Sequence, residues 1–150
     1  MPMNNVADNP KAGFEYEFQE YFEAGIELLG FEVKSLRTHK ANLEGSYIII
    51  RGAEAYIMNL FVAPYQEANT PKDYEPRRNR RLLLNKKEIL RLATVSENNG
   101  LTVIPISMYI KNNLIKVKIA VAKRKKKQDK RESIKKRETD RNLRREYNVR

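Results

Sequence analysis

Clustered lysines and arginines are the residues of this sequence whose type and spacing best suit a binding function. The last 28 residues, 123–150, hold 14 of the 30 basic residues and five of the 19 acidic ones, whereas residues 1–122 are nearly neutral. A second basic run spans Arg77–Arg81. Such clusters bind phosphate backbones because they release condensed counterions. The charge pattern therefore favours a nucleic-acid partner; the alternatives are a solubilising tail and, for Arg77–Arg81, a solvated loop.

Other chemistries have little support. The chain has no cysteine, so thiol catalysis, disulfides and cysteine-ligated metals are excluded, and its one histidine, His39, lies in a polar stretch. Carboxylates are plentiful between Glu15 and Glu32, but Glu15 and Glu17 alternate with apolar residues, as an exposed strand face does, and no spacing singles out a catalytic pair. No glycine-rich phosphate loop is present. We expect no catalytic residue, no metal site and no cofactor.

The elements that must position these cations are mostly strands. Phe14, Tyr16 and Phe18 alternate with polar residues, which predicts a half-buried strand. Two hairpins are expected, residues 46–51 with 54–63 and residues 101–110 with 114–121. Their turns lie at Gly52 and at Asn112-Asn113, residue types that accept left-handed backbone angles.

Helices and breaks complete the pattern. Residues 31–42 predict a short helix, and Asn85 with Glu88 forms a capping box at the start of another. Pro105 would remove a hydrogen-bond donor from a strand, so we place it at an edge or a bulge. In the last strand Lys116 and Lys118 face away from the apolar residues, which gives one core face and one cationic face.

The predicted fold class is mainly β with α: a small OB-type β-barrel with two or three flanking helices and a basic C-terminal tail that is disordered in isolation. We divide the chain into a flexible N-terminus (1–13), an OB-like RNA-binding body (14–122) and the tail (123–150). No transmembrane span or signal peptide is evident, and the tail has no amphipathic face. The expected location is the cytoplasm, away from membranes.

Several segments, in order along the chain, resemble the SmpB family of SsrA-binding proteins. They are F-E-A-G-I at 22–26, E-V-K-S-L-R at 32–37, K-A-N-L at 40–43, S-Y at 46–47, R-L-L-L-N at 81–85, K-V-K-I-A-V-A-K at 116–123 and D-K-R at 129–131. The resemblance covers roughly residues 15–136.

This resemblance implies a bacterial factor without catalytic activity that binds transfer-messenger RNA (tmRNA, or SsrA) and delivers it to stalled ribosomes for trans-translation, the rescue and peptide tagging of stalled chains. The body would bind the tRNA-like domain of the RNA. The tail would become helical in the 16S rRNA decoding centre and the empty mRNA channel. Elongation factor Tu (EF-Tu) with alanyl-tmRNA is the expected partner during delivery.

The resemblance also implies site residues. Glu23 and Leu83 match RNA-binding positions, as an acceptor for base or ribose groups and as an apolar surface for an unstacked base. Further expected RNA contacts are Asn9, Lys34, Arg37, Tyr47, Arg80 and Arg81. The expected ribosome contacts in the tail are Lys123, Lys125, Lys126, Gln128, Asp129, Lys130, Arg131, Ile134 and Lys135.

Alternatives remain at this point. Leu83 is equally compatible with a core position, and Tyr47 with a buried strand aromatic. Another ribosome-associated RNA-binding protein with an OB-type barrel would share these features. An RNA-processing enzyme using the carboxylates between Glu15 and Glu32 is a third hypothesis.

Overall fold

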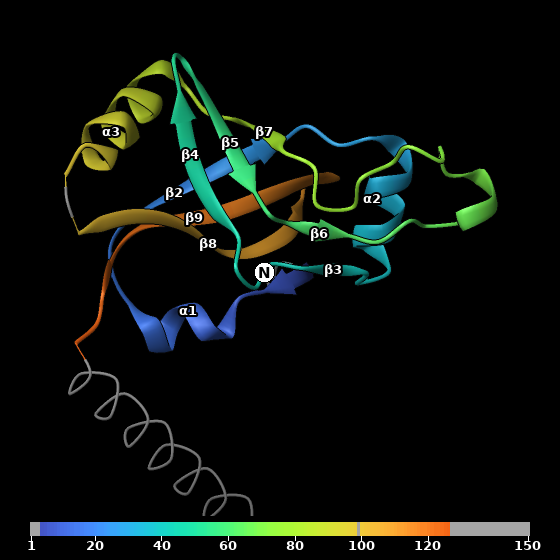
Figure 1. Cartoon of the computed structure of the whole chain (residues 1–150), viewed down its shortest axis with the longest axis horizontal. Helices are drawn as coiled ribbons and strands as arrows, with labels where there is room; N and C mark the ends of the chain where they lie inside the picture. The colour runs from blue at the N-terminus through green and yellow to red at the C-terminus, as the bar shows by residue number, and fades with distance from the viewer. Residues whose placement is uncertain (1–3, 99, 127–150) are drawn as a thin grey trace, which may run out of the picture.

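The computed structural model describes residues 4–98 and 100–126, which form a mainly β body with three α-helices (Figure 1). The strands are β1 (Asn4–Asp8), β2 (Tyr16–Ile26), β3 (Ala41–Asn42), β4 (Tyr47–Arg51), β5 (Glu54–Met58), β6 (Phe61–Val62), β7 (Arg80–Leu83), β8 (Leu101–Lys111) and β9 (Leu114–Arg124). The helices are α1 (Pro10–Glu15), α2 (Gly30–Arg37) and α3 (Lys86–Ser96), and a 3-10 turn spans Glu67–Asn69. None of the helices in this part of the chain is long and apolar enough to cross a membrane.

The main sheet closes on itself. Its strand order is β1-β8-β4-β5-β7-β2-β9, and an additional pairing joins β9 back to β8, so β1 is attached outside a ring of six strands. The long antiparallel pairings β2–β9 and β8–β9 form one wall of the ring. Helices α2 and α3 lie at opposite ends of the ring, and α1 lies near the start of β2 (Figure 1).

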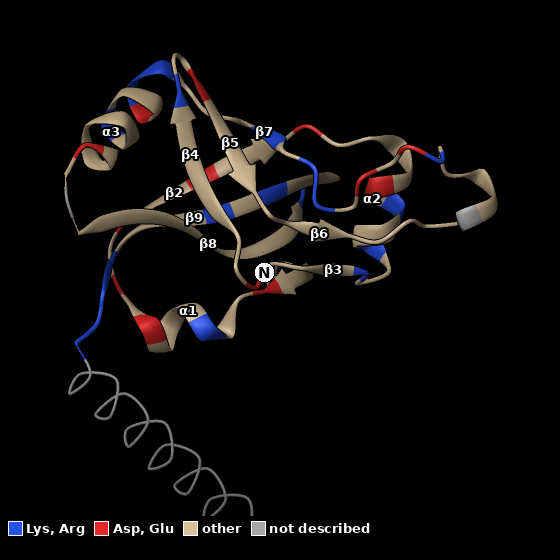
Figure 2. Cartoon of the chain, viewed as in Figure 1, with Lys and Arg blue, Asp and Glu red and all other residues tan. Residues whose placement is uncertain are grey.

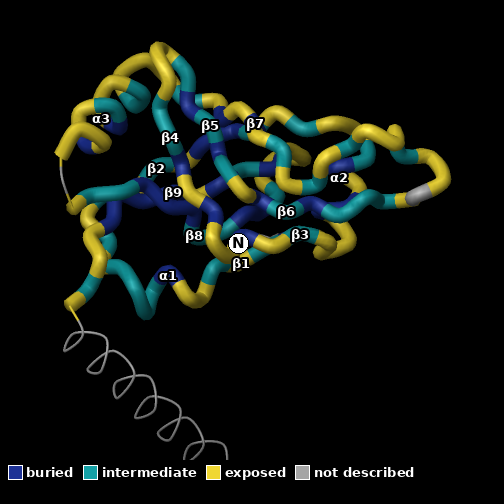
Figure 3. The backbone as a smooth tube through the Cα atoms, viewed as in Figure 1, coloured by how far each residue is buried: buried dark blue, intermediate teal, exposed yellow. Residues whose placement is uncertain are grey.

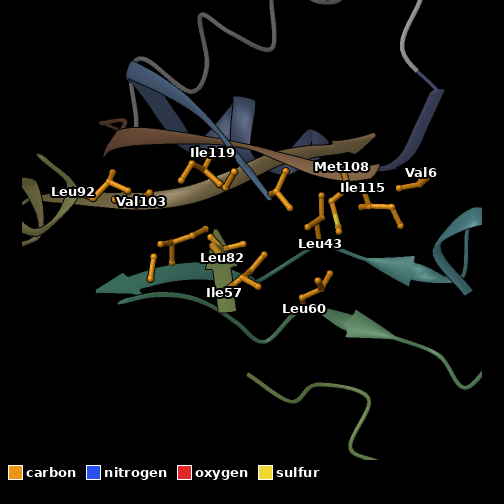
Figure 4. Close-up of a cluster of buried hydrophobic side chains, with 14 of the residues drawn as sticks. Val6, Leu43, Ile57, Leu60, Leu82, Leu92, Val103, Met108, Ile115 and Ile119 are labelled. Atoms are coloured by element: carbon orange, nitrogen blue, oxygen red, sulfur yellow. The ribbon is translucent and has the colours of Figure 1, made fainter. Parts of the chain in front are cut away.

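Buried residues lie along the strands of the ring (Figure 3), and aliphatic side chains fill its interior (Figure 4). On β9, Val117, Ile119 and Val121 point inward and are almost completely buried, as the alternation in the sequence predicts. Ile57 of β5 and Leu82 of β7 belong to the same cluster. Burial of these side chains is the main favourable contribution to folding, at about 25 cal/mol per Å² of apolar surface.

Three local predictions are confirmed. Asn112 and Asn113 have φ angles of 52° and 63°, which is the left-handed geometry of a tight hairpin turn. The β8–β9 register shifts just after Pro105, so this proline lies at a bulge. The side chain of Asn85 accepts a hydrogen bond from the backbone of Glu88 (2.8 Å), and the Glu88 carboxylate accepts one from the backbone of Asn85 (3.1 Å).

The expectation that residues 1–13 form a flexible lead-in is wrong for the residues of this segment that the structure describes. Asn4–Asp8 pairs with β8 as an antiparallel edge strand, and Pro10 begins helix α1. An edge strand is held by backbone hydrogen bonds, so it does not need the apolar alternation that sequence analysis looks for. Of β1, Val6 is buried in the core and Ala7 packs against it.

Several element boundaries also differ from the prediction. β2 begins at Tyr16 rather than at Phe14, because α1 continues to Glu15. α2 ends at Arg37, and His39 beyond it has a left-handed φ of 60°. β5 ends at Met58, and Asn59 after it has a φ of 63°. β9 runs to Arg124, two residues past the expected end of the body.

A buried ion pair connects α2 to the start of β7. The side chains of Glu32 and Arg80 are both fully buried, and Arg80 Nε donates to Glu32 Oε2 over 2.7 Å. The remaining Arg80 donors reach the backbone oxygens of Leu60 (2.7 Å), Pro76 (3.0 Å) and Arg78 (3.1 Å). A buried charge is tolerated only when it is paired and hydrogen-bonded in this way.

Neighbouring groups complete this network. Burial opposes the charged form of Glu32, but hydrogen bonds from Arg78, the Leu29 backbone and Arg80 keep the pKa of the carboxyl below its usual range. The Tyr74 hydroxyl lies 3.0 Å from Glu32, and burial, together with that negative charge, raises the pKa of Tyr74 to about 12. The network thereby fixes the long loop between β6 and β7 against α2.

We predict that Arg80→Ala destabilises the fold strongly, because Glu32 would lose its one fully buried cationic partner and keep only the partly exposed Arg78 as a counter-charge. The expected loss is about 3–5 kcal/mol in the free energy of unfolding. Exposed Arg81 is the matched control, and Arg81→Ala should cost about 0–1 kcal/mol. Urea unfolding followed by circular dichroism measures both. Equal losses for the two variants would contradict the assigned role of the buried pair.

Candidate nucleic-acid interface

The outer surface of the wall formed by β2, β9 and β8 gathers charged and aromatic side chains. Val117 and Ile119 of β9 point into the core, so Lys116 and Lys118 on the same strand point outward. In the β2–β9 pairing, Lys116 lies opposite Gly25 and Lys118 lies opposite Glu23. On the other side of β9, Lys116 is paired with Tyr109 of β8. Basic residues are visible along β9 in Figure 2. We call this surface the Glu23 face; it consists of Tyr21, Glu23, Tyr109, Lys111, Lys116 and Lys118.

Glu23 is held in place across β9. The Tyr109 hydroxyl donates to Glu23 Oε2, while Lys111 Nζ lies 3.3 Å from Oε1 and 3.4 Å from Oε2. The Tyr109 bond lowers the pKa of the Glu23 carboxyl, with a further contribution from Lys111. Burial and this carboxylate in turn raise the pKa of Tyr109. The result is an oriented, ionised acceptor that is still 38% exposed.

An exposed aromatic ring lies beside this carboxylate on β2. Tyr21 is 53% exposed, and the Lys118 ammonium lies 4.7 Å from the centroid of its ring. A ring and a cation in this arrangement suit a strand of nucleic acid, because the ring can stack on a base while the ammonium contacts phosphate.

Leu83 lies next to the Glu23 face. Leu83 is directly opposite Gly25 in the β2–β7 pairing, and Gly25 is two residues along β2 from Glu23. Leu83 is 48% exposed. A core position for Leu83 is thereby excluded. The structure thus brings together the two residues singled out first, Glu23 and Leu83, on one surface.

Asn9 and Tyr47 form a second group, near the end of β9 where the tail begins. They line a cavity of about 370 Å³ with Tyr16 of β2. Asn9 Nδ2 donates to the Pro105 carbonyl over 2.9 Å, and Tyr47 is 43% exposed rather than buried. Near this end of β9, Lys125 Nζ donates to the Gly13 carbonyl over 3.0 Å.

The remaining expected body contacts fall into two classes. Lys34 and Arg37 are exposed on α2, and Arg81 is exposed, with Nη1 3.3 Å from Glu27. The structure contradicts the expectation that Arg80 contacts RNA, because its side chain is fully buried against Glu32. In a run of arginines the sequence gives no sign of which one turns inward.

The tail is described only at its root. Lys123 and Lys126 are exposed there, and Lys125 is half-buried. The other expected ribosome contacts lie outside the described residues: Gln128, Asp129, Lys130, Arg131, Ile134 and Lys135.

Sequence reasoning missed Tyr109, Lys111 and Tyr21. Tyr109 lies 86 positions from Glu23 in the sequence, and its strand alone does not reveal that the hydroxyl crosses β9. Only the outward orientation of Lys116 and Lys118 was predicted, from the alternation along β9. Among the described residues, no group of three or more histidine or carboxylate side chains is placed to hold a metal ion.

A mainly β sheet that closes on itself and carries basic and aromatic side chains on its outer surface suits a nucleic-acid-binding protein of the OB-like class. Comparison with known proteins specifies the family. The model of the family described as SmpB protein matches residues 6–149.

Named relatives agree with this match. The SsrA-binding protein of Trichodesmium erythraeum is 47% identical and that of Nostoc punctiforme 45%, each over 93% of this chain and 90% of the relative. The SsrA-binding protein of Latilactobacillus sakei is 41% identical over 95% of this chain and 90% of its own length.

A solved chain from work described as "tmRNA-SmpB: a journey to the center of the bacterial ribosome" superposes with a TM-score of 0.67. It is 38% identical and the match covers 85% of this chain and 92% of that one. The chain therefore belongs to the SmpB family, and the predicted OB-type fold class is confirmed.

We predict that Tyr109→Phe raises the pKa of Glu23, because it removes the hydrogen bond that lowers it most. A carboxyl with a lowered pKa in the folded state stabilises the protein above its unfolded pKa of about 4.3, and this stabilisation is lost as pH falls through the folded pKa. The unfolding free energy of the variant should therefore fall less between neutral and acidic pH than that of the wild type.

Carbon-detected NMR titration of the Glu23 carboxyl is the direct measurement. Tyr56→Phe is the matched control, because the Tyr56 hydroxyl donates to a different carboxylate, that of Glu54. An unchanged Glu23 pKa in Tyr109→Phe, or an equal change in Tyr56→Phe, would contradict this assignment.

Proposed function

We propose that this protein binds transfer-messenger RNA and delivers it to stalled ribosomes for trans-translation. The observation that carries the proposal is similarity over nearly the whole chain to proteins named SsrA-binding, together with the match to a chain from a tmRNA-SmpB ribosome study. The acceptor, cations and exposed ring of the Glu23 face support this proposal. In this role the protein is a binding factor without catalytic activity of its own.

The Glu23 face and Leu83 recognise the tRNA-like domain of the RNA. The oriented carboxylate of Glu23 accepts hydrogen bonds from base or ribose groups, and Leu83 offers apolar surface to an unstacked base. Lys116 and Lys118 provide positive charge for neighbouring phosphates. Lys34, Arg37 and Arg81 extend the positive surface, and Asn9 and Tyr47 lie toward the tail.

Residues 123–150 act on the ribosome. Their net charge of +9 favours rRNA, and neutralisation by a polyanion removes the repulsion that opposes a helix. The D-K-R element at 129–131 and its neighbours enter the 16S rRNA decoding centre and the empty mRNA channel. Elongation factor Tu carries the alanyl-tmRNA complex to the ribosome, which places the protein in the cytoplasm.

Competitive binding tests the body site. The full-length protein should bind the tRNA-like domain of transfer-messenger RNA in preference to ordinary tRNA at near-physiological salt. Glu23→Ala and Leu83→Ala should each weaken this binding by about 10-fold, as expected for one lost hydrogen bond to a charged group or one lost apolar contact. Glu97→Ala, at the exposed end of α3, is a control that should bind as the wild type does. Equal binding to all RNAs, unaffected by either substitution, would refute the proposal.

Truncation after Lys126 tests the division of labour, since every described strand and helix is kept. The shortened chain should retain selective binding of the tRNA-like domain and lose peptide tagging of stalled chains in a reconstituted translation system. Tagging at the wild-type level by this variant would refute the proposed role of the tail.

A further inference from the structure

The start of β9 forms one side of an apolar cleft for which we infer a ligand. Leu83 of β7 and Leu114 of β9 are 48% and 59% exposed, and both line a cleft of about 200 Å³. We propose that Leu114 is the second wall of a subsite that holds one unstacked nucleobase between itself and Leu83. This inference rests on the proposed function and identifies what the Leu83 region binds.

Two features of the backbone keep the cleft open. A Cβ atom on Gly25 would lie 3.2 Å from the Cβ of Leu83, so the absence of a side chain there leaves space beside the leucine. The left-handed turn at Asn112-Asn113 ends the β8–β9 hairpin and presents Leu114 at its tip. Ile26, Leu28, Val33 and Ile115 complete the apolar lining.

The size and surroundings of the cleft fit a base. Its volume is smaller than the roughly 300–1,000 Å³ of pockets that enclose drug-sized ligands, but it suits one flat ring system. Asn113 and Lys116 are the polar members of the lining, and they can meet a base edge and a phosphate. Unstacked bases pack on apolar and aromatic side chains in single-stranded RNA recognition.

Charge favours RNA over an apolar protein side chain as the occupant. Lys111 is directly opposite Leu114 in the β8–β9 pairing, and its ammonium reaches Glu23. The cleft therefore has Lys111 and Lys116 on its β8–β9 side, with the Glu23 acceptor nearby. A base, its sugar and its phosphate match this combination of apolar slot, acceptor and cations.

The test measures the affinity of the full-length protein for the tRNA-like domain of transfer-messenger RNA. Leu114→Ala should weaken binding by about 5- to 20-fold, because a base loses one apolar wall. Leu114→Phe should retain or improve the affinity, since a larger apolar surface still packs on the base. Leu90→Ala is the matched control: Leu90 is 67% exposed on α3, at the opposite end of β9.

A series of abasic RNAs provides a second measurement with the unaltered protein. One single-stranded nucleotide should weaken wild-type binding at least as much when its base is removed. The same removal should cost clearly less in Leu114→Ala, where only the Leu83 wall is left to lose. Such non-additivity identifies the base in the cleft.

The outcomes separate the two proposals. Two results would overturn the cleft proposal alone while the wild type still binds the tRNA-like domain selectively. One is an RNA affinity of Leu114→Ala equal to that of Leu90→Ala. The other is that no abasic site shows coupling to Leu114. If Leu114→Ala keeps the wild-type RNA affinity but loses peptide tagging, the cleft proposal is also overturned, because the cleft would then bind a protein or ribosomal partner. Absence of selective wild-type binding would overturn both the cleft and the proposed function.

Discussion

Arg80 brings a full positive charge into the interior of the protein, and Glu32 supplies the compensating negative charge. Through this pair α2, the link between β5 and β6, the long loop before β7 and β7 itself are held as one unit. β7 is the strand that pairs with both β5 and β2, so the closure of the ring depends on where Arg80 is anchored. A hydrophobic pair in its place would fill the same space, but it would not fix the positions of these elements through directional hydrogen bonds.

The position of the candidate RNA surface follows from that closure. Once β7 is anchored, Leu83 lies opposite Gly25, and the long β2–β9–β8 wall carries Glu23 next to it. The alternation of β9 sends its aliphatic residues inward and Lys116 and Lys118 outward. Tyr109 then crosses β9 to orient Glu23. The same strand pairings that build the core therefore build an acceptor, an apolar wall and a cationic surface.

Local chemistry made much of the fold predictable. The capping residues Asn85 and Glu88, the asparagine turn before β9 and the bulge at Pro105 each depend on neighbouring residues, and all were predicted. Features that depend on distant partners were not. The burial of Arg80 requires Glu32, 48 positions away, and the edge strand β1 requires β8. For the site, Glu23 and Leu83 came from family resemblance, whereas Tyr109 and Leu114 emerged only when the strands were paired.

The central claim is that the body recognises RNA through the Glu23 face and the neighbouring leucines, independently of the basic tail. NMR chemical-shift mapping of the labelled full-length protein with the tRNA-like domain tests it most directly. We predict that the largest changes fall on Tyr21, Glu23, Leu83, Leu114 and Lys118, with α3 unaffected. Changes confined to residues 123–150, with this surface unaltered, would contradict the account.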